Sequence, residues 1–200
     1  VMMGVNADDY VITPNITFIA TCNSIKYTGA DPILIDTHPG SWQMDLDLLE
    51  QFLSEETEQR NGVCHYKKDG RRIPILMPVH VLGNMCDMDR LMALAKQNNV
   101  TVIEDSTEAL GSYYKGKHAG SFGLMGTFSY NGNKIITTGG GGMIEPVKSM
   151  SAALGSAPAG RVAGLPGTVS VGWSALVHPS RRWPKIFQIN RERRLWNMRT

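Results

Sequence analysis

The 200 residues are 42% hydrophobic and 19% charged, a composition typical of a globular protein and not of an intrinsically disordered chain. No apolar run approaches the roughly 18 residues that a membrane-spanning helix needs, and no signal-peptide pattern opens the chain, so we expect a cytoplasmic protein without a membrane partner. The three cysteines, Cys22, Cys64 and Cys86, are odd in number and widely spaced. This spacing suggests neither a disulfide framework nor a zinc site, and it is compatible with a reducing compartment.

The net charge of +2 hides an asymmetry along the chain. Residues 1–144 contain 11 Lys and Arg against 16 Asp and Glu, whereas residues 145–200 contain 9 against 2. A basic segment can indicate contact with nucleic acid or a membrane, but this one also lacks a clear hydrophobic period. We therefore predict a domain over residues 1–144, followed by a poorly matched basic tail that is truncated or aberrant, and no nucleic-acid partner.

The first part of the chain predicts a strand, a helix and a second strand. Residues 10–13 have the pattern of a strand, and residues 17–27 have apolar residues at helical spacing behind Asn15 or Thr17 as the N-cap. Residues 32–36 form the second predicted strand. Strand, helix and strand within about 30 residues indicate a βαβ unit with parallel pairing.

The alternation of helices and strands continues through the middle of the chain. Residues 45–53 and 87–98 have one apolar face at helical spacing, and the first of these has acidic residues in its first turn, where they suit the helix dipole. Residues 54–72 are polar, and we expect them to be a surface excursion. Further strands are predicted over residues 74–79, 100–103 and 126–130. The fold class is therefore α/β, with a mixed, mostly parallel sheet flanked by helices.

Polar residues follow two of the predicted strands. His80 comes after the third strand, and the fourth strand ends on Glu104 and Asp105. Ligands in open α/β sheets bind beyond the carboxyl ends of the strands, so Asp105 and His80 are the polar groups best placed for chemistry. For His80, a structural hydrogen bond at a strand end is equally compatible with the pattern.

One lysine, Lys134, lies in an otherwise uncharged segment, residues 123–144, ahead of the glycine run 139–142. Lysine normally lies on solvated surface, and an amine held in uncharged surroundings is disposed to lose its proton and act as a nucleophile. A surface hairpin with a solvated lysine is the simpler alternative on this segment alone. The glycine run lacks the G-x-G-x-x-G spacing at the start of a helix, which argues against a nicotinamide enzyme.

Four motifs in order carry a family resemblance: TPNITFIATCNSIKYTGADPILIDT, PVHVLG, VIEDSTEALGSYYKGKHAGSFG and GTFSYNGNKIITTGGGGMI. Over residues 1–144 the sequence resembles the sugar aminotransferases of the DegT/DnrJ/EryC1/StrS family. The resemblance implies an incomplete large domain of the aspartate-aminotransferase fold, which binds pyridoxal 5'-phosphate. The form NGNKIITTGGGGM, with the polar segment 54–72, is similar to the branch that aminates UDP-linked 4-keto sugars in bacillosamine- and legionaminic-acid-type pathways.

The resemblance assigns roles to five residues and none to a metal ligand. Lys134 matches the lysine that bonds covalently to the cofactor aldehyde, and Asp105 matches the aspartate that pairs with the pyridine nitrogen. Glu108 falls where many members have a glutamine that faces the cofactor's 3-hydroxyl group. Ser129 matches a serine that binds the phosphate, and Phe18 falls where an aromatic ring stacks on the cofactor.

The implied reaction is amino transfer in two halves. An amino acid, expected to be glutamate, leaves its nitrogen on the cofactor, and a nucleotide-linked keto sugar takes it. Lys134 would move the proton between the substrate carbon and the cofactor. Family members are homodimers with shared sites, and their pattern extends beyond both ends of the matching segment, so we expect only part of a site. The alternatives are amination of a different keto substrate, or a non-catalytic domain or inactive fragment.

Overall fold

A mixed β-sheet is the centre of the molecule. The computed structural model describes residues 3–146, 169–170, 186–189 and 196–198, so most of the predicted tail, residues 145–200, lies outside the described residues. Within the described part, nine strands form the sheet in the order β11-β10-β9-β6-β5-β1-β2-β12-β13. Their bounds are β1 Tyr10–Pro14, β2 Asp31–Ile35, β5 Ile75–Leu76, β6 Thr101–Asp105, β9 Met125–Ser129, β10 Gly142–Pro146, β11 Val169–Ser170, β12 Ile186–Ile189 and β13 Trp196–Met198.

The strands that position the site run parallel. β1 pairs in parallel with both β2 and β5, β5 pairs with β6, and β6 pairs with β9. β10 returns antiparallel to β9. The parallel βαβ unit predicted at the start of the chain is confirmed, because helix α1 (Ile19–Tyr27) connects β1 to β2. The third predicted strand is shorter than residues 74–79, since Pro74 and Pro78 flank β5 and lack the N–H groups that a longer ladder would use.

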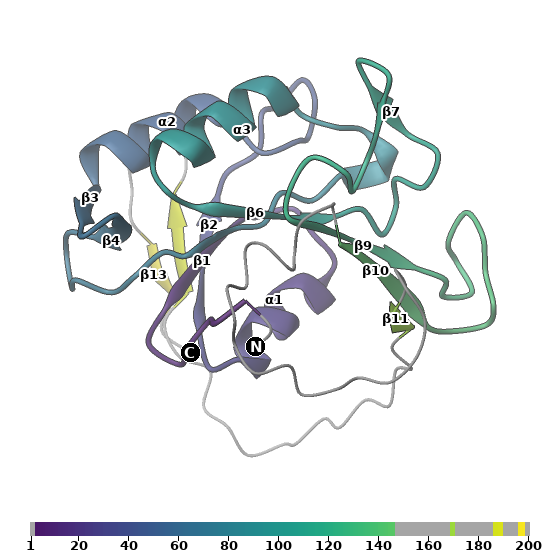
Figure 1. Ribbon diagram of the computed structural model, residues 1–200, viewed down its shortest axis with the longest axis horizontal. Coiled ribbons are helices and arrows are strands. Elements are labelled where there is room, and N and C mark those ends of the chain that lie inside the picture. Colours follow the sequence, from purple (N-terminus) through teal and green to yellow (C-terminus); the bar gives the residue numbers. More distant parts are fainter. Residues whose placement is uncertain (1–2, 147–168, 171–185, 190–195, 199–200) are drawn as a thin grey trace.

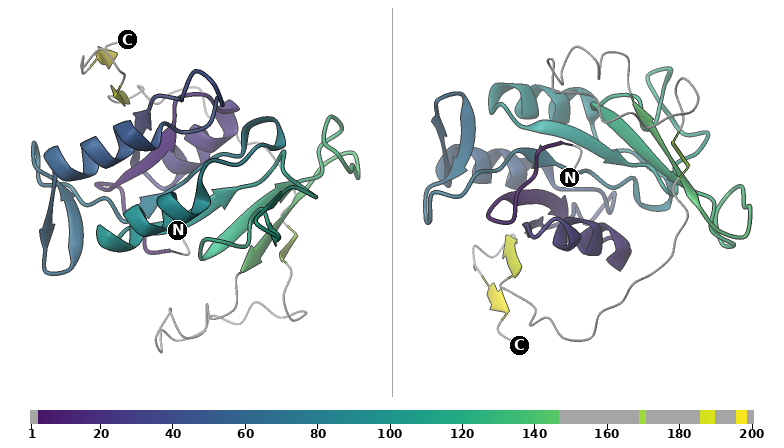
Figure 2. Two further views of the ribbon diagram at one scale, coloured as in Figure 1. Left: turned by 90° about the horizontal axis from the view of Figure 1, so that it is seen from above. Right: turned by 60° about the horizontal axis from the view of Figure 1, so that its bottom comes forward.

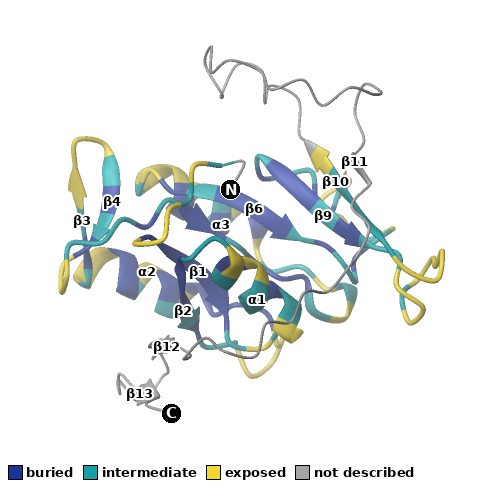
Figure 3. Cartoon of the chain, turned by 90° about the horizontal axis from the view of Figure 1, so that it is seen from below, coloured by how far each residue is buried: buried dark blue, intermediate teal, exposed yellow. Residues whose placement is uncertain are grey.

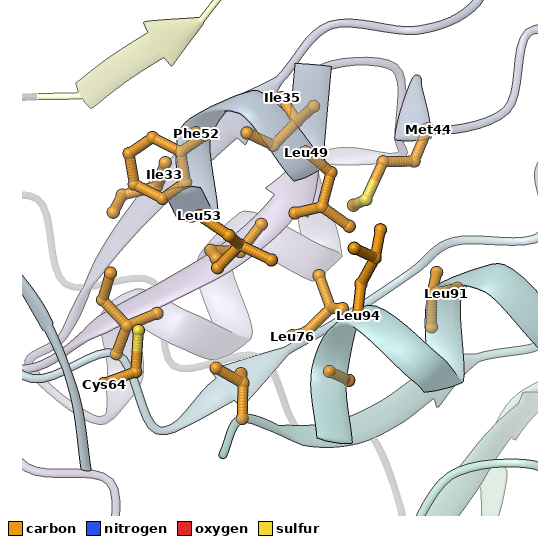
Figure 4. Close-up of a cluster of buried hydrophobic side chains, with 14 of the residues drawn as sticks. Ile33, Ile35, Met44, Leu49, Phe52, Leu53, Cys64, Leu76, Leu91 and Leu94 are labelled. Atoms are coloured by element: carbon orange, nitrogen blue, oxygen red, sulfur yellow. The ribbon is translucent and has the colours of Figure 1, made fainter. Parts of the chain in front are cut away.

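Helices cover both faces of the sheet (Figure 1). α1 lies on one face, and α2 (Leu46–Glu55) and α3 (Met88–Gln97) lie on the other. Because successive strand residues point to opposite faces, Ile12 of β1 joins the core under α2 and α3, whereas Val11 joins the core under α1. Figure 4 shows the larger core, which contains Leu49 and Phe52 of α2 together with Leu91 and Leu94 of α3.

α2 and α3 begin where their capping residues predict. The Asp45 side chain accepts hydrogen bonds from the backbone N–H groups of Asp47 and Leu48, and the Asp87 side chain accepts one from Arg90. An N-cap aspartate satisfies donors that the first helical turn leaves free. Both helices confirm the prediction from apolar spacing. No helix in the described ranges is both long enough and apolar enough to span a bilayer.

The start of α1 differs from the prediction. Its N-cap is Phe18, whose side chain makes no capping hydrogen bond, so neither Asn15 nor Thr17 caps the helix. The Asn15 amide instead donates to Asp36 at 2.7 Å, and the Thr17 hydroxyl is hydrogen-bonded to the Thr21 hydroxyl at 2.7 Å. Tertiary partners therefore take the side chains that the local pattern assigned to capping.

The polar segment 54–72 is more ordered than predicted. It contains a hairpin of β3 (Thr57–Arg60) and β4 (Val63–Tyr66). Cys64 and Tyr66 on β4 are buried and belong to the core that α2 and α3 cover. The expectation of a surface excursion was wrong for β4, because alternate residues of this short strand face inward while β3 remains largely exposed (Figure 3).

Candidate functional site

Two parallel strands end side by side at one edge of the sheet. β6 ends at Asp105 and β9 ends at Ser129, and the strand register places Asp105 opposite Thr127. This is the carboxyl edge, where ligands bind in open α/β sheets. The position of Asp105 at this edge is the one that the sequence predicts.

Lys134 lies on the loop that joins β9 to β10. The loop extends away from the sheet in both views of Figure 2, and the neighbouring Ile135 and Ile136 are exposed. The Lys134 side chain, however, is only 13% exposed, and its Nζ lies 3.3 Å from Oε1 of Glu108. The reading of Lys134 as a solvated surface lysine is therefore wrong. The idea of uncharged surroundings is wrong as well, since the fold brings a carboxylate to the amine.

Asp105 is held by helix α1. The buried Thr21 hydroxyl donates to Oδ2 of Asp105 at 2.6 Å, and the backbone N–H of Thr107 donates to Oδ1 at 3.2 Å. Thr21 is not predicted as a site residue from the sequence. The available signal was the four-residue spacing of Thr17 and Thr21 in the predicted helix 17–27, which would place both hydroxyls on one side; the observed helix begins later, at Ile19.

Phe18 and Ser129 flank this arrangement without touching Lys134 through a hydrogen bond. Phe18, the N-cap of α1, is 72% exposed. The Ser129 hydroxyl accepts the backbone N–H of Asn131 at 3.3 Å. The structure thus joins Lys134 directly to Glu108, and joins α1 to Asp105. It places Phe18 at the start of α1 and Ser129 at the end of β9.

His80 belongs to the interior and not to the site. It is buried, and its Nε2 lies 3.0 Å from Oε2 of the buried Glu104. Backbone N–H groups of Gly120, Phe122 and Gly123 also donate to Glu104. The structural alternative for His80 is therefore the correct one, because Glu104 and Asp105 are consecutive on β6 and point to opposite sides.

The environment of Glu104 sets its ionisation. Burial acts to raise the pKa of this carboxyl, but the hydrogen bonds from His80, Gly123 and Gly120 outweigh burial, so the pKa lies below its ordinary value. Glu104 is thus a buried carboxylate that four donors stabilise. Glu104 is named from the sequence as the end of the strand, but its buried hydrogen-bonding role is not predicted there.

The family is decided by comparison with known proteins. The model of the DegT/DnrJ/EryC1/StrS aminotransferase family matches residues 1–148. The chain belongs to this family. GDP-perosamine synthase of Escherichia coli O157:H7 is 44% identical over 142 residues, which are 71% of this chain and 35% of that protein. EpsN of Bacillus subtilis strain 168, whose name is that of a pyridoxal phosphate-dependent aminotransferase, is 41% identical over 143 residues, 72% of this chain and 34% of EpsN.

A solved structure agrees with the family in fold. A DegT DnrJ EryC1 StrS aminotransferase from Brucella abortus superposes with a TM-score of 0.65 at 26% identity, over 76% of this chain and 38% of that chain. The expected fold, the large domain of the aspartate-aminotransferase fold in part, is confirmed. The chain spans about a third of the length of the curated relatives it matches.

Pyridoxal phosphate is the cofactor of the DegT/DnrJ/EryC1/StrS family, and the groups at the carboxyl edge fit it. Lys134 offers a primary amine for the aldehyde, and Asp105 offers a carboxylate for the ring nitrogen. Ser129 offers a hydroxyl for the phosphate, and Phe18 an exposed flat ring. Among the described residues no cluster of three or more His, Cys, Asp or Glu could hold a metal ion.

Proposed function

We propose that the protein transfers an amino group from an amino acid such as glutamate to a nucleotide-linked keto sugar, with pyridoxal phosphate bound at the carboxyl edge of β6 and β9. The observation that carries the proposal is Lys134, which lies on an exposed loop and yet folds back to meet Glu108 beside the end of β6. Membership of an aminotransferase family supports this reading. We assign residues 1–144 to cofactor binding and leave the basic tail, residues 145–200, without a role.

Each candidate residue has a distinct task in this proposal. Bound pyridoxal phosphate supplies an aldehyde and an electron-withdrawing ring. Asp105, fixed by Thr21, would keep the ring nitrogen protonated, because an opposite charge nearby favours the charged form. Lys134 would hold the cofactor and, once displaced, carry a proton to or from the reacting substrate carbon. Ser129 and Phe18 would fix the phosphate and the ring face, and Glu108 would face the 3-hydroxyl group.

The sugar nucleotide is the finer part of the proposal. The relative at 44% identity is named for a GDP-linked product, and this favours a GDP-linked keto sugar over the UDP-linked one that the loop sequence predicts. We also propose a homodimer, because the family resemblance implies sites that are shared between two chains. A cytoplasmic location is compatible with the three free thiols, Cys22, Cys64 and Cys86.

Reductive labelling tests the proposal. Borohydride added to the chain with pyridoxal phosphate should fix one cofactor on Lys134, as peptide mass spectrometry would show. Lys134→Ala should lose the label, and Lys117→Ala, at an exposed lysine, should keep it. An unlabelled wild-type chain, or an equally labelled Lys134→Ala, would sink the proposal and favour a non-catalytic domain. Product assays with GDP- and UDP-linked 4-keto sugars and glutamate then decide the nucleotide, and other keto substrates test the remaining alternative.

A further inference from the structure

The loop that follows β5 has an unusual backbone. Leu82 lies in the left-handed region, with φ 55° and ψ 27°, and Gly83 follows with φ 78°. Leucine in this region costs about 1–2 kcal/mol. Leu82 is 72% exposed, so burial does not offset the cost. A strained, exposed residue of this kind persists only where its surroundings fix it.

Three side chains from two other segments hold this loop, residues 80–84. The Gln43 amide donates to the Val81 carbonyl at 3.1 Å, and the Ser112 hydroxyl donates to the Gly83 carbonyl at 2.7 Å. The backbone N–H of Leu82 donates to Oε2 of Glu108 at 2.9 Å. The segment just before the β7–β8 hairpin (Tyr113–Tyr114 and Lys117–His118) thus packs on the loop, and the hairpin rises beside it in Figure 1.

Glu108 uses both of its carboxylate oxygens. Oε2 accepts the Leu82 N–H, and Oε1 lies 3.3 Å from Nζ of Lys134. One carboxylate therefore spans the gap between the loop and the amine. A glutamine could accept only at its single oxygen, because its second terminal atom is an NH₂ donor that faces an ammonium or N–H group unfavourably. Only an acid of this length serves both nitrogens.

We propose that Glu108 is a positioning residue that fixes the 80–84 loop and Lys134 relative to each other. The proposal deepens the proposed function and rests on it for the role of Lys134, while the link between loop and amine rests on geometry alone. Gly83 supports it, since a Cβ added there would lie 3.1 Å from the Glu108 carbonyl oxygen. The backbone of the loop therefore lies directly against the residue that holds it.

Two measurements on the full chain without cofactor separate the two contacts. Hydrogen exchange at the Leu82 amide reports the loop contact, and acetylation of Lys134, followed by mass spectrometry, reports the amine contact. Glu108→Ala should speed both about five- to tenfold, the effect of losing a hydrogen bond of roughly 1 kcal/mol. Glu108→Gln should speed acetylation of Lys134 by a similar factor and leave Leu82 exchange within twofold, because the amide oxygen still accepts the Leu82 N–H.

Controls make the outcome decisive. Glu58→Gln, at a partly exposed glutamate paired with Arg60, should change neither measurement. The backbone N–H of Gly120, which donates a hydrogen bond to Glu104, should keep its exchange rate in every variant. Unchanged Leu82 exchange in Glu108→Ala, or deprotection of Gly120 to the same degree, would overturn the proposal. Reductive labelling of Lys134 in the wild type remains a separate result, so failure of the proposed function is distinguishable.

Discussion

At the scale of single residues, the end of β6 divides two tasks between neighbouring acids. Glu104 points into the interior, where it accepts hydrogen bonds from His80 and from backbone N–H groups within residues 120–123. Asp105 points to the carboxyl edge, where Thr21 holds it. The first acid ties the segment after the β7–β8 hairpin to the sheet, and the second faces the candidate cofactor site. A shift of one residue in this strand would exchange the two roles.

The buried acid gives a prediction with a defined pH dependence. Glu104→Gln should lower the free energy of unfolding at pH 7 by about 3 kcal/mol, because it leaves His80 and backbone donors without a carboxylate. The folded-state pKa of Glu104 is depressed below 4.5, so its stabilisation is fully present above that pH and is lost as the pH falls through the folded pKa. Urea titrations at several pH values should therefore show the two proteins converging in acid, with Glu58→Gln as a partly exposed control. A constant gap down to the acid limit would contradict the assignment.

At the scale of elements, helix α1 connects the smaller core, on its own face of the sheet, to the site. Ile25 packs in the smaller core, the Thr21 hydroxyl donates a hydrogen bond to Asp105, and Phe18 is exposed to solvent at the helix start. A single helix thus fixes the orientation of the carboxylate and presents the aromatic ring. Its stability and the geometry of the site are linked through one hydroxyl.

Removal of that hydroxyl tests the link. Thr21→Val keeps the shape of the side chain but takes the donor from Asp105, so the free energy of unfolding should fall by about 1.5–3 kcal/mol, the range for hydrogen bonds to charged groups. Thr17→Val, which removes only contacts between neutral groups, to the Thr21 hydroxyl and the Phe18 carbonyl, should cost less than 1 kcal/mol. Chemical denaturation of both variants measures the difference. Equal losses in the free energy of unfolding would show that the hydrogen bond from Thr21 to Asp105 stabilises the fold no more than the contact between neutral groups does.

The elements also show how far sequence reasoning reaches. α2 and α3 could be predicted because apolar spacing and N-cap aspartates are local signals. β4 could not, since a four-residue strand with two inward side chains leaves too short a pattern within polar sequence. Lys134 and Asp105 could be named from motifs, but the contact between Lys134 and Glu108 joins residues 26 positions apart. Such pairings follow from the packed sheet and not from either segment alone.

At the scale of the whole molecule, packing and chemistry occupy different places. The larger core lies between the sheet and the helices α2 and α3 (Figure 4), whereas the candidate site lies at the carboxyl edge of β6 and β9. No residue of the Lys134–Glu108 pair belongs to either core cluster. The sheet therefore positions the site at its edge, while the side chains of the core clusters take no part in the Lys134–Glu108 pair.

This separation predicts two opposite kinds of variant. Leu49→Ala, at a fully buried position of α2, should lower the free energy of unfolding by about 2–5 kcal/mol through the cavity it leaves. The fraction of folded molecules that take a borohydride-fixed cofactor on Lys134 should stay unchanged, because Leu49 packs in the larger core, to which neither Lys134 nor Glu108 belongs. Lys134→Ala should do the reverse: it loses the label and shifts stability by less than about 1 kcal/mol, since an exposed loop carries the residue and its partner is partly solvated. Denaturation curves and labelling stoichiometry, measured on the same samples below the melting transition, decide the matter. If labelling of Lys134 in Leu49→Ala fell in proportion to the loss of stability, the geometry of the carboxyl edge would depend on the packing of the core, and the prediction would be wrong.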